Sequence, residues 1–462
     1  MKTSRNKVTI LNIASTIVLQ GLAFFTGPIF SAMLGTSNYG IASVYLTWVQ
    51  LASTVFTLQA GGTVAIAKVN FPEEEQAKYQ SSVLSLSSIS YLCFSVLTVI
   101  GSLIMSNWFS ISISMILVGL LHGWGLYVVS FMNLKYTYEL KAGRNSILSV
   151  LVSALSIALS IFLIYKMSPD VNYWGRLIGQ SAVYTVIGVI LFSNILKAGK
   201  VIVDKNYWKF TLPIAIPTIF HLLAGLVLNQ SDRVMIQGLI DNSAAGIYAL
   251  ACTFGTVLHS IWSALNNSWV PYYYEYTKNK QIDEIRKHAN NYIELYTVIA
   301  MGFILLSKEV FHFYAKPAFW EGTDLIPIFS IGFYFIFLYS LPVNFEFYHK
   351  KTKTIAVGTT LAAVCNIILN YFFILKFGIW GAVIATAIAH GLQFGFHYIC
   401  AKRINPEEFP FKILQFVPGF IAVCLTCVVY WFTRELWFVR WGLGALLGAY
   451  LLIKIIKRRE IF

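Results

Sequence analysis

The sequence predicts an all-α integral membrane protein that crosses the bilayer about fourteen times. Of its 462 residues, 57% are hydrophobic and only 12% are charged, whereas a soluble domain carries about 25% charged residues. The mean hydropathy is +0.67. A soluble core of this size could not keep so much apolar surface away from water, so lipid must surround much of the chain.

The expected spans follow from length, because a transmembrane helix needs about 20 mostly apolar residues. Short polar segments connect them, and none is long enough to form a soluble domain. The expected spans are residues 8–31, 41–67, 81–105, 109–132, 146–166, 173–195, 211–232, 244–270, 291–312, 324–348, 354–376, 378–400, 413–433 and 437–456.

Lysine and arginine are distributed unevenly over the connecting segments. With the N-terminus placed inside, 26 of the 34 basic residues fall on the inner side, and every inner segment carries positive charge. Cytoplasmic segments of membrane proteins show this excess. We therefore expect a multi-pass protein of the cell membrane, the cytoplasmic or inner one, with both termini in the cytoplasm.

The formal net charge of +14 indicates contact with anionic membrane lipids, because the basic residues lie in short loops between apolar runs. We expect no nucleic-acid partner. The six cysteines lie within or beside apolar runs, and the pair Cys424 and Cys427 has no second metal-ligand pair nearby. We expect these cysteines to pack in the interior, and we expect no metal site and no bound cofactor.

Two pairs of segments suggest an internal repeat. The sequence LGTSNYGIASVYL at 34–46 resembles LIDNSAAGIYALA at 239–251, and SIALSIFLIYK at 156–166 resembles NIILNYFFILK at 366–376. The offsets of 206 and 210 residues are nearly equal and keep the register of the spans. We therefore predict two six-helix lobes related by a parallel repeat, with an axis along the membrane normal.

The repeat predicts a division of the chain into lobes. Its parts are a first lobe at 1–195, a cytoplasmic linker at 196–211, a second lobe at 212–400 and two additional spans within 401–462.

The segment 212–275 resembles the seventh and eighth spans of Wzx-type polysaccharide flippases, a branch of the multidrug/oligosaccharidyl-lipid/polysaccharide exporter superfamily. The segment 34–46 is similar to the first loop of this family, and 351–394 resembles its eleventh and twelfth spans. The matching motifs are Leu212-Pro213, Asn229 to Arg233, Gly246-Ile247-Tyr248 and Trp269-Val270-Pro271.

This resemblance implies a bilobed fold like that of the drug exporters of the superfamily (the MATE-like fold) and a transporter rather than an enzyme. The implied substrate is an undecaprenyl-diphosphate-linked oligosaccharide unit for a surface polysaccharide such as O-antigen or capsule. Alternating access of a central polar cavity would move it, with H⁺ or Na⁺ coupling left open. The polymerase or export machinery would be protein partners.

Other functions stay open at this point. They are a flippase for a peptidoglycan-type precursor, a cation-coupled drug exporter of the same superfamily, and a membrane glycosyltransferase or polymerase. The lack of a large outer loop counts against the last of these, as does the lack of a phosphate-binding glycine loop or a nucleophile elbow.

Charged residues within spans are costly and indicate function by default. Asp232 and Arg233 close the seventh expected span. Arg233 could bind the diphosphate or an acidic sugar while Asp232 orients it, or the two residues could anchor the helix end. Glu294 and His221 are candidates for ion coupling, since both side chains can exchange a proton.

Amide side chains within spans could donate hydrogen bonds to sugar hydroxyls, although hydrogen bonding between helices is the alternative for each of them. Asn366 and Asn370 are four residues apart and share a helix face. The amide candidates are Gln20, Asn229, Gln230, Asn266, Asn267, Asn366 and Asn370.

Overall fold

The computed structural model describes residues 2–104 and 112–458, with side chains described from residue 21 onward apart from 23, 455 and 458. These residues form helices and no strand, which confirms the all-α prediction. Each expected span lies largely within helix where the structure describes it; residues 105 and 109–111 lie outside the described part. Within the described residues, ten helices are long and apolar enough to cross a membrane, or up to 11 if a bent pair is one span.

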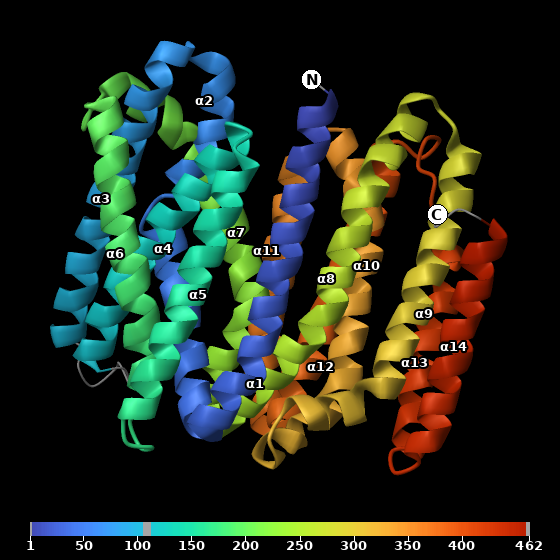
Figure 1. Ribbon diagram of the computed structural model, residues 1–462. Helices are drawn as coiled ribbons and strands as arrows, with labels where there is room; N and C mark the ends of the chain where they lie inside the picture. The colour runs from blue at the N-terminus through green and yellow to red at the C-terminus, as the bar shows by residue number, and fades with distance from the viewer. Residues whose placement is uncertain (1, 105–111, 459–462) are drawn as a thin grey trace. The chain divides into compact units, whose positions relative to one another are not determined.

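The chain divides into two compact units, residues 1–230 and 231–462. The boundary falls within one long helix, α7, so it does not coincide with the expected linker at 196–211, and the predicted lobe boundaries stay a prediction. Unit 1 contains α1 (Lys2–Val55), η1 (Ala60–Thr63), α2 (Val64–Asn70), α3 (Glu73–Ile104), α4 (Ile113–Tyr138), α5 (Ala142–Lys166), α6 (Tyr173–Gly199) and the first part of α7 (Lys205–Leu239) (Figure 1).

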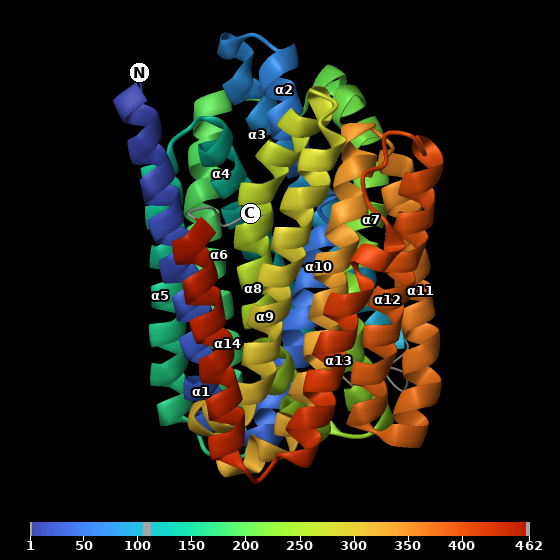
Figure 2. The same ribbon diagram turned by 90° about the vertical axis from the view of Figure 1, so that its right-hand side faces the viewer.

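Unit 2 begins within α7 and continues to the end of the chain. Its further helices are α8 (Asn242–Lys278), α9 (Ile282–Tyr314), η2 (Pro317–Leu325), α10 (Ile326–Tyr348), α11 (Thr352–Phe377), α12 (Ile379–Ile404), η3 (Ile413–Gln415), α13 (Val417–Phe432) and α14 (Trp437–Arg458). Within this unit, α13 and α14 both pack against α9, as Figures 1 and 2 show. The two helices without a predicted counterpart are thus attached through α9.

The sequence led us to expect a loop between spans 8–31 and 41–67. In the structure, the connection is instead a break at a single residue, Gly35. Its φ of 69° and ψ of −179° break α1 into two helices, and the ribbon turns back at its lower end in Figure 1. This conformation is open to glycine because it has no Cβ. The expected span 41–67 is also broken, since Leu58 and Gln59 have positive φ and the chain bends by 51° before Ala60.

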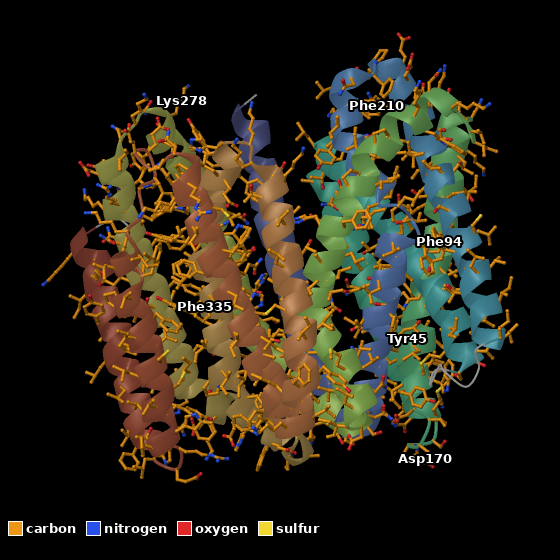
Figure 3. The ribbon with its side chains drawn as sticks, turned by 180° about the vertical axis from the view of Figure 1, so that it is seen from behind. Tyr45, Phe94, Asp170, Phe210, Lys278 and Phe335 are labelled. Atoms are coloured by element: carbon orange, nitrogen blue, oxygen red, sulfur yellow. The ribbon has the colours of Figure 1, made fainter. Side chains whose placement is uncertain are left out.

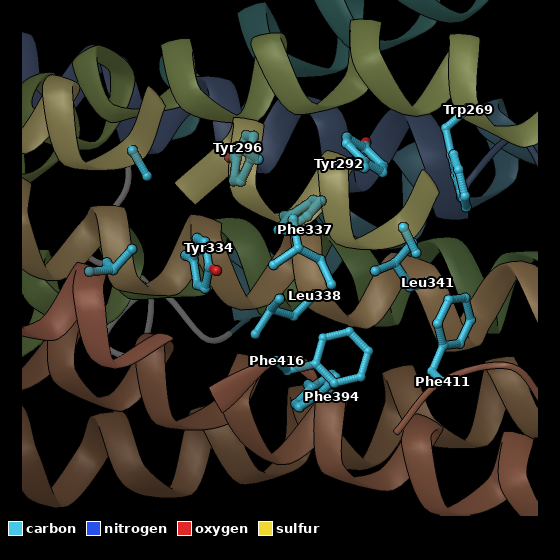
Figure 4. Packing of buried hydrophobic residues seen from close by; sticks show 14 of the residues in the cluster. Trp269, Tyr292, Tyr296, Tyr334, Phe337, Leu338, Leu341, Phe394, Phe411 and Phe416 are labelled. Carbon is cyan, nitrogen blue, oxygen red and sulfur yellow. The ribbon is translucent and has the colours of Figure 1, made fainter. Parts of the chain in front are cut away.

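Aromatic side chains fill the core of unit 2 (Figure 4). The ring centroids of Tyr296 and Phe337 are 4.4 Å apart, and Tyr292 meets Phe337 edge to face at 5.0 Å. Trp269 is fully buried in the same cluster. Such contacts between rings stabilise a core beyond the area that they bury, so α8, α9 and α10 form a well-packed group.

Three turns have the same backbone geometry: the α8–α9 turn at Lys280, with φ 55°, and two turns at matching positions of the two units. The α4–α5 turn has Leu140 at φ 57°, and the Lys141 amide donates to the carbonyl of Tyr136 at 2.8 Å. The α10–α11 turn has Lys350 at φ 59°, and the Lys351 amide donates to the carbonyl of Glu346 at 2.9 Å. Each residue of the α10–α11 turn lies 210 positions after its counterpart in the α4–α5 turn, an offset that the sequence repeat also has.

The helix pairs that follow the α4–α5 and α10–α11 turns also pack alike. A methyl group added to Gly175 on α6 would lie 2.5 Å from the amide nitrogen of Ile164 on α5. A methyl group added to Gly381 on α12 would lie 2.8 Å from the amide nitrogen of Ile374 on α11. Close backbone approach at small residues is typical of helices packed within membranes. The matching contacts support the predicted parallel repeat.

Candidate functional site

In unit 2, the helical hairpins α7–α8 and α11–α12 each place polar residues at the same distance from their turn. Ile240 lies in the turn between α7 and α8. Asp232 lies eight residues before Ile240, and Tyr248 lies eight residues after it. Asn370 and Thr386 lie eight residues before and after Gly378, the turn between α11 and α12. Residues equidistant from such a turn lie side by side, because the rise per residue is the same in both helices.

Asp232 is the centre of this group, and its side chain is 3% exposed. Its Oδ2 accepts hydrogen bonds from the hydroxyls of Tyr248 at 2.5 Å and Thr386 at 2.7 Å. Its Oδ1 accepts a hydrogen bond from the amide of Asn370 at 2.5 Å. Since a buried carboxylate without such donors would cost several kcal/mol, these three side chains stabilise the charge.

A second layer of hydrogen bonds holds the donors in place. The amide of Asn370 also donates to Asn366 Oδ1 at 3.0 Å, and the amide of Asn366 donates to the hydroxyl of Thr386 at 3.0 Å. Ser231 donates to Asn366 Oδ1 at 3.4 Å. We call Asp232, Tyr248, Asn366, Asn370 and Thr386 the Asp232 cluster. It joins α7, α8, α11 and α12.

The cluster contains Asp232, Asn366 and Asn370 among the sequence-predicted site residues. Asn366 and Asn370 are both 0% exposed, so in this conformation they bind neighbouring helices, which was the alternative to sugar binding. Arg233 follows Asp232 and interacts electrostatically with it and with the thiol of Cys252. The roles in substrate binding stay predictions.

The other amide candidates lie elsewhere. Asn229 is exposed, and its amide donates to the carbonyl of Gly225 on its own helix at 2.7 Å. Gln230 donates to Gln50 within unit 1, and Asn266 accepts from Asn344 at 3.3 Å. Asn267 is exposed, whereas the side chain of Gln20 lies outside the described side chains.

The two ion-coupling candidates have different surroundings. Glu294 forms an ion pair with Lys454 and accepts a hydrogen bond from Tyr450, both on α14. His221 on α7 is half-buried, and its Nδ1 has no hydrogen-bond partner in the described part of the chain. The partners of Glu294 suit a contact that fastens α14 to α9.

Three residues of unit 2 were missed by sequence reasoning. Tyr248 was noted only as part of a motif, and Thr386 carried no signal because threonine is common in spans. Glu346 forms a buried pair with His397 at 2.8 Å. Glu346 lies inside the expected span 324–348, so the rule that charged residues within spans indicate function could have identified it.

The all-helical fold with two units, kinked spans and a buried carboxylate cluster resembles the fold of solved membrane transporters. One solved structure of similar fold is the lipid II flippase MurJ in an inward closed conformation, with a TM-score of 0.75 and 17% identity over 97% of this chain and 99% of that chain. Another is an inward-facing multidrug resistance transporter of the MATE family, with a TM-score of 0.57 and 12% identity over 90% of this chain and 98% of that chain.

The chain belongs to the polysaccharide biosynthesis protein family, whose sequence model matches residues 6–277. The family model of the lipid II flippase MurJ matches residues 277–452. A protein of the Lsg locus of Haemophilus influenzae is 21% identical over 379 residues, which cover 79% of this chain and 90% of that protein. These findings confirm the resemblance that the sequence motifs indicated.

Proposed function

We propose that this protein flips undecaprenyl-diphosphate-linked oligosaccharide units across the cytoplasmic membrane by alternating access, for the assembly of a surface polysaccharide. The observation that carries the proposal is the family match over residues 6–277, combined with a fold like that of a lipid flippase. The physical need is clear, because each unpaired sugar hydroxyl that enters hydrocarbon costs several kcal/mol. A protein path avoids that cost.

The test is reconstitution of the purified protein into vesicles that contain a fluorescent undecaprenyl-diphosphate oligosaccharide. The protein should make inner-leaflet probe accessible to an external reagent, whereas vesicles without protein should keep that probe protected. A peptidoglycan-type precursor and a cationic drug are the competing cargoes. Transport of either of these, without transport of the oligosaccharide, would replace the proposal.

Arg233 is our candidate for contact with the anionic part of this cargo. Arg233→Lys keeps the charge but loses the two-pronged hydrogen bonding of the guanidinium, so it should retain part of the activity, and Arg233→Ala should lose most of it. Arg144→Ala removes an exposed arginine of unit 1 and is the control. Full flipping by Arg233→Ala would leave only the anchoring role.

The Asp232 cluster is our candidate for the coupling ion, either H⁺ or Na⁺. It offers oxygen atoms of Asp232, Tyr248 and Thr386, and Oδ1 of Asn370 is buried without a hydrogen-bond partner in the described residues. Oxygen atoms of this kind suit a hard cation, whereas Glu294 is already neutralised by Lys454.

Asp232→Asn removes the charge at nearly constant volume, so it should abolish any dependence of flipping on a Na⁺ or H⁺ gradient. Asp170→Asn, at an exposed site in the α5–α6 loop, is the control. Gradient-dependent flipping by Asp232→Asn would exclude the cluster as the coupling site without touching the cargo assignment.

A further inference from the structure

A pocket at one end of unit 1 is lined by residues of α2, α3, α4 and the α4–α5 turn. Figure 1 shows where these elements lie. Figure 3 labels Phe210 at this end of the unit and Asp170 at the opposite end. The pocket has a volume of about 520 Å³, within the usual range of small-molecule sites. The residues that matter for its chemistry are Lys68, Glu73, Gln80, Lys135, Glu139 and Lys141.

The pocket has more positive than negative charge. Glu139 is shared by two ammonium groups: Nζ of Lys135 lies 3.8 Å from one carboxylate oxygen, and Nζ of Lys141 lies 2.6 Å from the other. Lys68 donates to the backbone carbonyl of Tyr138, which carries no charge. Even with Glu73, exposed at the rim, three ammonium groups face two carboxylates, so an anion would find an unneutralised positive charge.

Gln80 gives an independent indication of a ligand. Its side chain is only 4% exposed, it lines the pocket, and it forms no hydrogen bond with another described residue. Buried polar groups nearly always have a partner. The neighbouring Gln76, by contrast, donates to the carbonyls of Ala67 and Phe71. The amide of Gln80 is therefore placed to bond with something inside the pocket.

We propose that this pocket binds a phosphate group of an anionic membrane ligand, held by Lys135, Lys141 and the amide of Gln80. Lysine binds phosphate as a point charge, and its ammonium supplies several donors at once. By the positive-inside rule this end of unit 1 faces the cytoplasm, where anionic headgroups gather and basic pockets between helices bind them. The proposal does not depend on which cargo the protein carries.

Two sources could supply such a phosphate: the headgroup of an anionic phospholipid, or the diphosphate of a prenyl-linked molecule. The probes are dihexanoyl phosphatidylglycerol for the first source and geranyl diphosphate for the second. Dihexanoyl phosphatidylcholine, which has a phosphate but no net charge, is the control ligand. Binding to the full-length protein in a neutral detergent is measured by isothermal calorimetry at low and moderate salt.

Two variants remove the binding groups separately: Lys135→Gln combined with Lys141→Gln, and Gln80→Leu. Each should weaken binding by about ten-fold or more, the effect of losing one charge-assisted hydrogen bond. Lys78→Gln changes an exposed lysine on the same helix, outside the pocket, and should leave binding unchanged. The unfolding temperature of each variant shows whether it is folded, and Gln80→Leu carries the test if the lysine variant is not.

If the pocket variants bind both anionic probes more weakly than the unchanged protein does, the pocket is a general phosphate site. Weakened binding of phosphatidylglycerol alone identifies a phospholipid site, and of geranyl diphosphate alone a site for prenyl diphosphates. The proposal is overturned if neither probe binds, if phosphatidylcholine binds equally well, or if binding is the same in the Gln80→Leu and lysine variants as in the unchanged protein.

Discussion

A carboxylate oxygen of Glu346 on α10 lies 2.8 Å from Nδ1 of His397 on α12, and neither side chain is exposed to solvent. The other oxygen of Glu346 and Nε2 of His397 have no hydrogen-bond partner in the described part of the chain. Among the described residues, each of these two side chains therefore has the other as its only hydrogen-bond partner. The pair joins α10 directly to α12.

We predict that breaking this pair destabilises unit 2. Glu346→Leu or His397→Leu leaves one buried polar group without a partner, which should lower the free energy of unfolding by about 3 kcal/mol. The double variant removes both groups and should cost less than the sum of the two single changes. Thermal unfolding of all three variants in detergent measures the coupling, and strictly additive losses would mean that the pair does not interact.

The matching glycines Gly175 and Gly381 give a second prediction. A Cβ at either position would meet the backbone of the preceding helix at less than 3.0 Å, so Gly175→Ala and Gly381→Ala should each destabilise the protein by about 1–3 kcal/mol. Gly143→Ala is the control, since no atom lies within 4 Å of its added Cβ, and this helical position should gain slightly from alanine. Equal stability in all three variants would remove this support for the repeat.

Most of the fold could be predicted from the sequence, because the lipid that surrounds the chain allows few kinds of structure to cross it. Lipid requires runs of about 20 apolar residues and helical hydrogen bonding, and both leave a plain pattern along the chain. A connection between spans 8–31 and 41–67 was predicted, but its form as a break at the single residue Gly35 was not, and neither was the break at Leu58 and Gln59. They depend on the φ angles of single residues, which hydropathy does not report.

The candidate site could be predicted only in part, for a related reason. Asp232, Asn366 and Asn370 were noticed because polar groups are rare in spans. Their partners Tyr248 and Thr386 are ordinary span residues, and they become significant only when two hairpins align them. Contacts between distant helices leave no local pattern, so the sequence could not show that Asn370 bonds to Asp232 and Asn366 to Thr386, rather than either to a substrate.

The membrane orientation is a third prediction. In a variant without its six cysteines, new cysteines at the exposed positions Lys200 and Lys351 should react only after the membrane is made permeable, because the positive-inside rule places both in the cytoplasm. A cysteine at the exposed position Lys316 should react with an impermeant reagent from outside. Outside labelling at position 200 or 351 contradicts the orientation, and with it the cytoplasmic termini.

The last prediction concerns the cargo in the cell. Deletion of the gene should stop surface polysaccharide assembly after the lipid-linked unit is complete, because the oligosaccharide head cannot enter hydrocarbon without losing the water on its hydroxyls. Lipid extracts should then contain the intact unit on undecaprenyl diphosphate, protected from reagents added outside the cell, and the unchanged gene should restore the polymer. An incomplete unit would indicate a missing glycosyltransferase step. A complete unit displayed outside but left unpolymerised would assign the step to a polymerase, and the flippase proposal would be wrong.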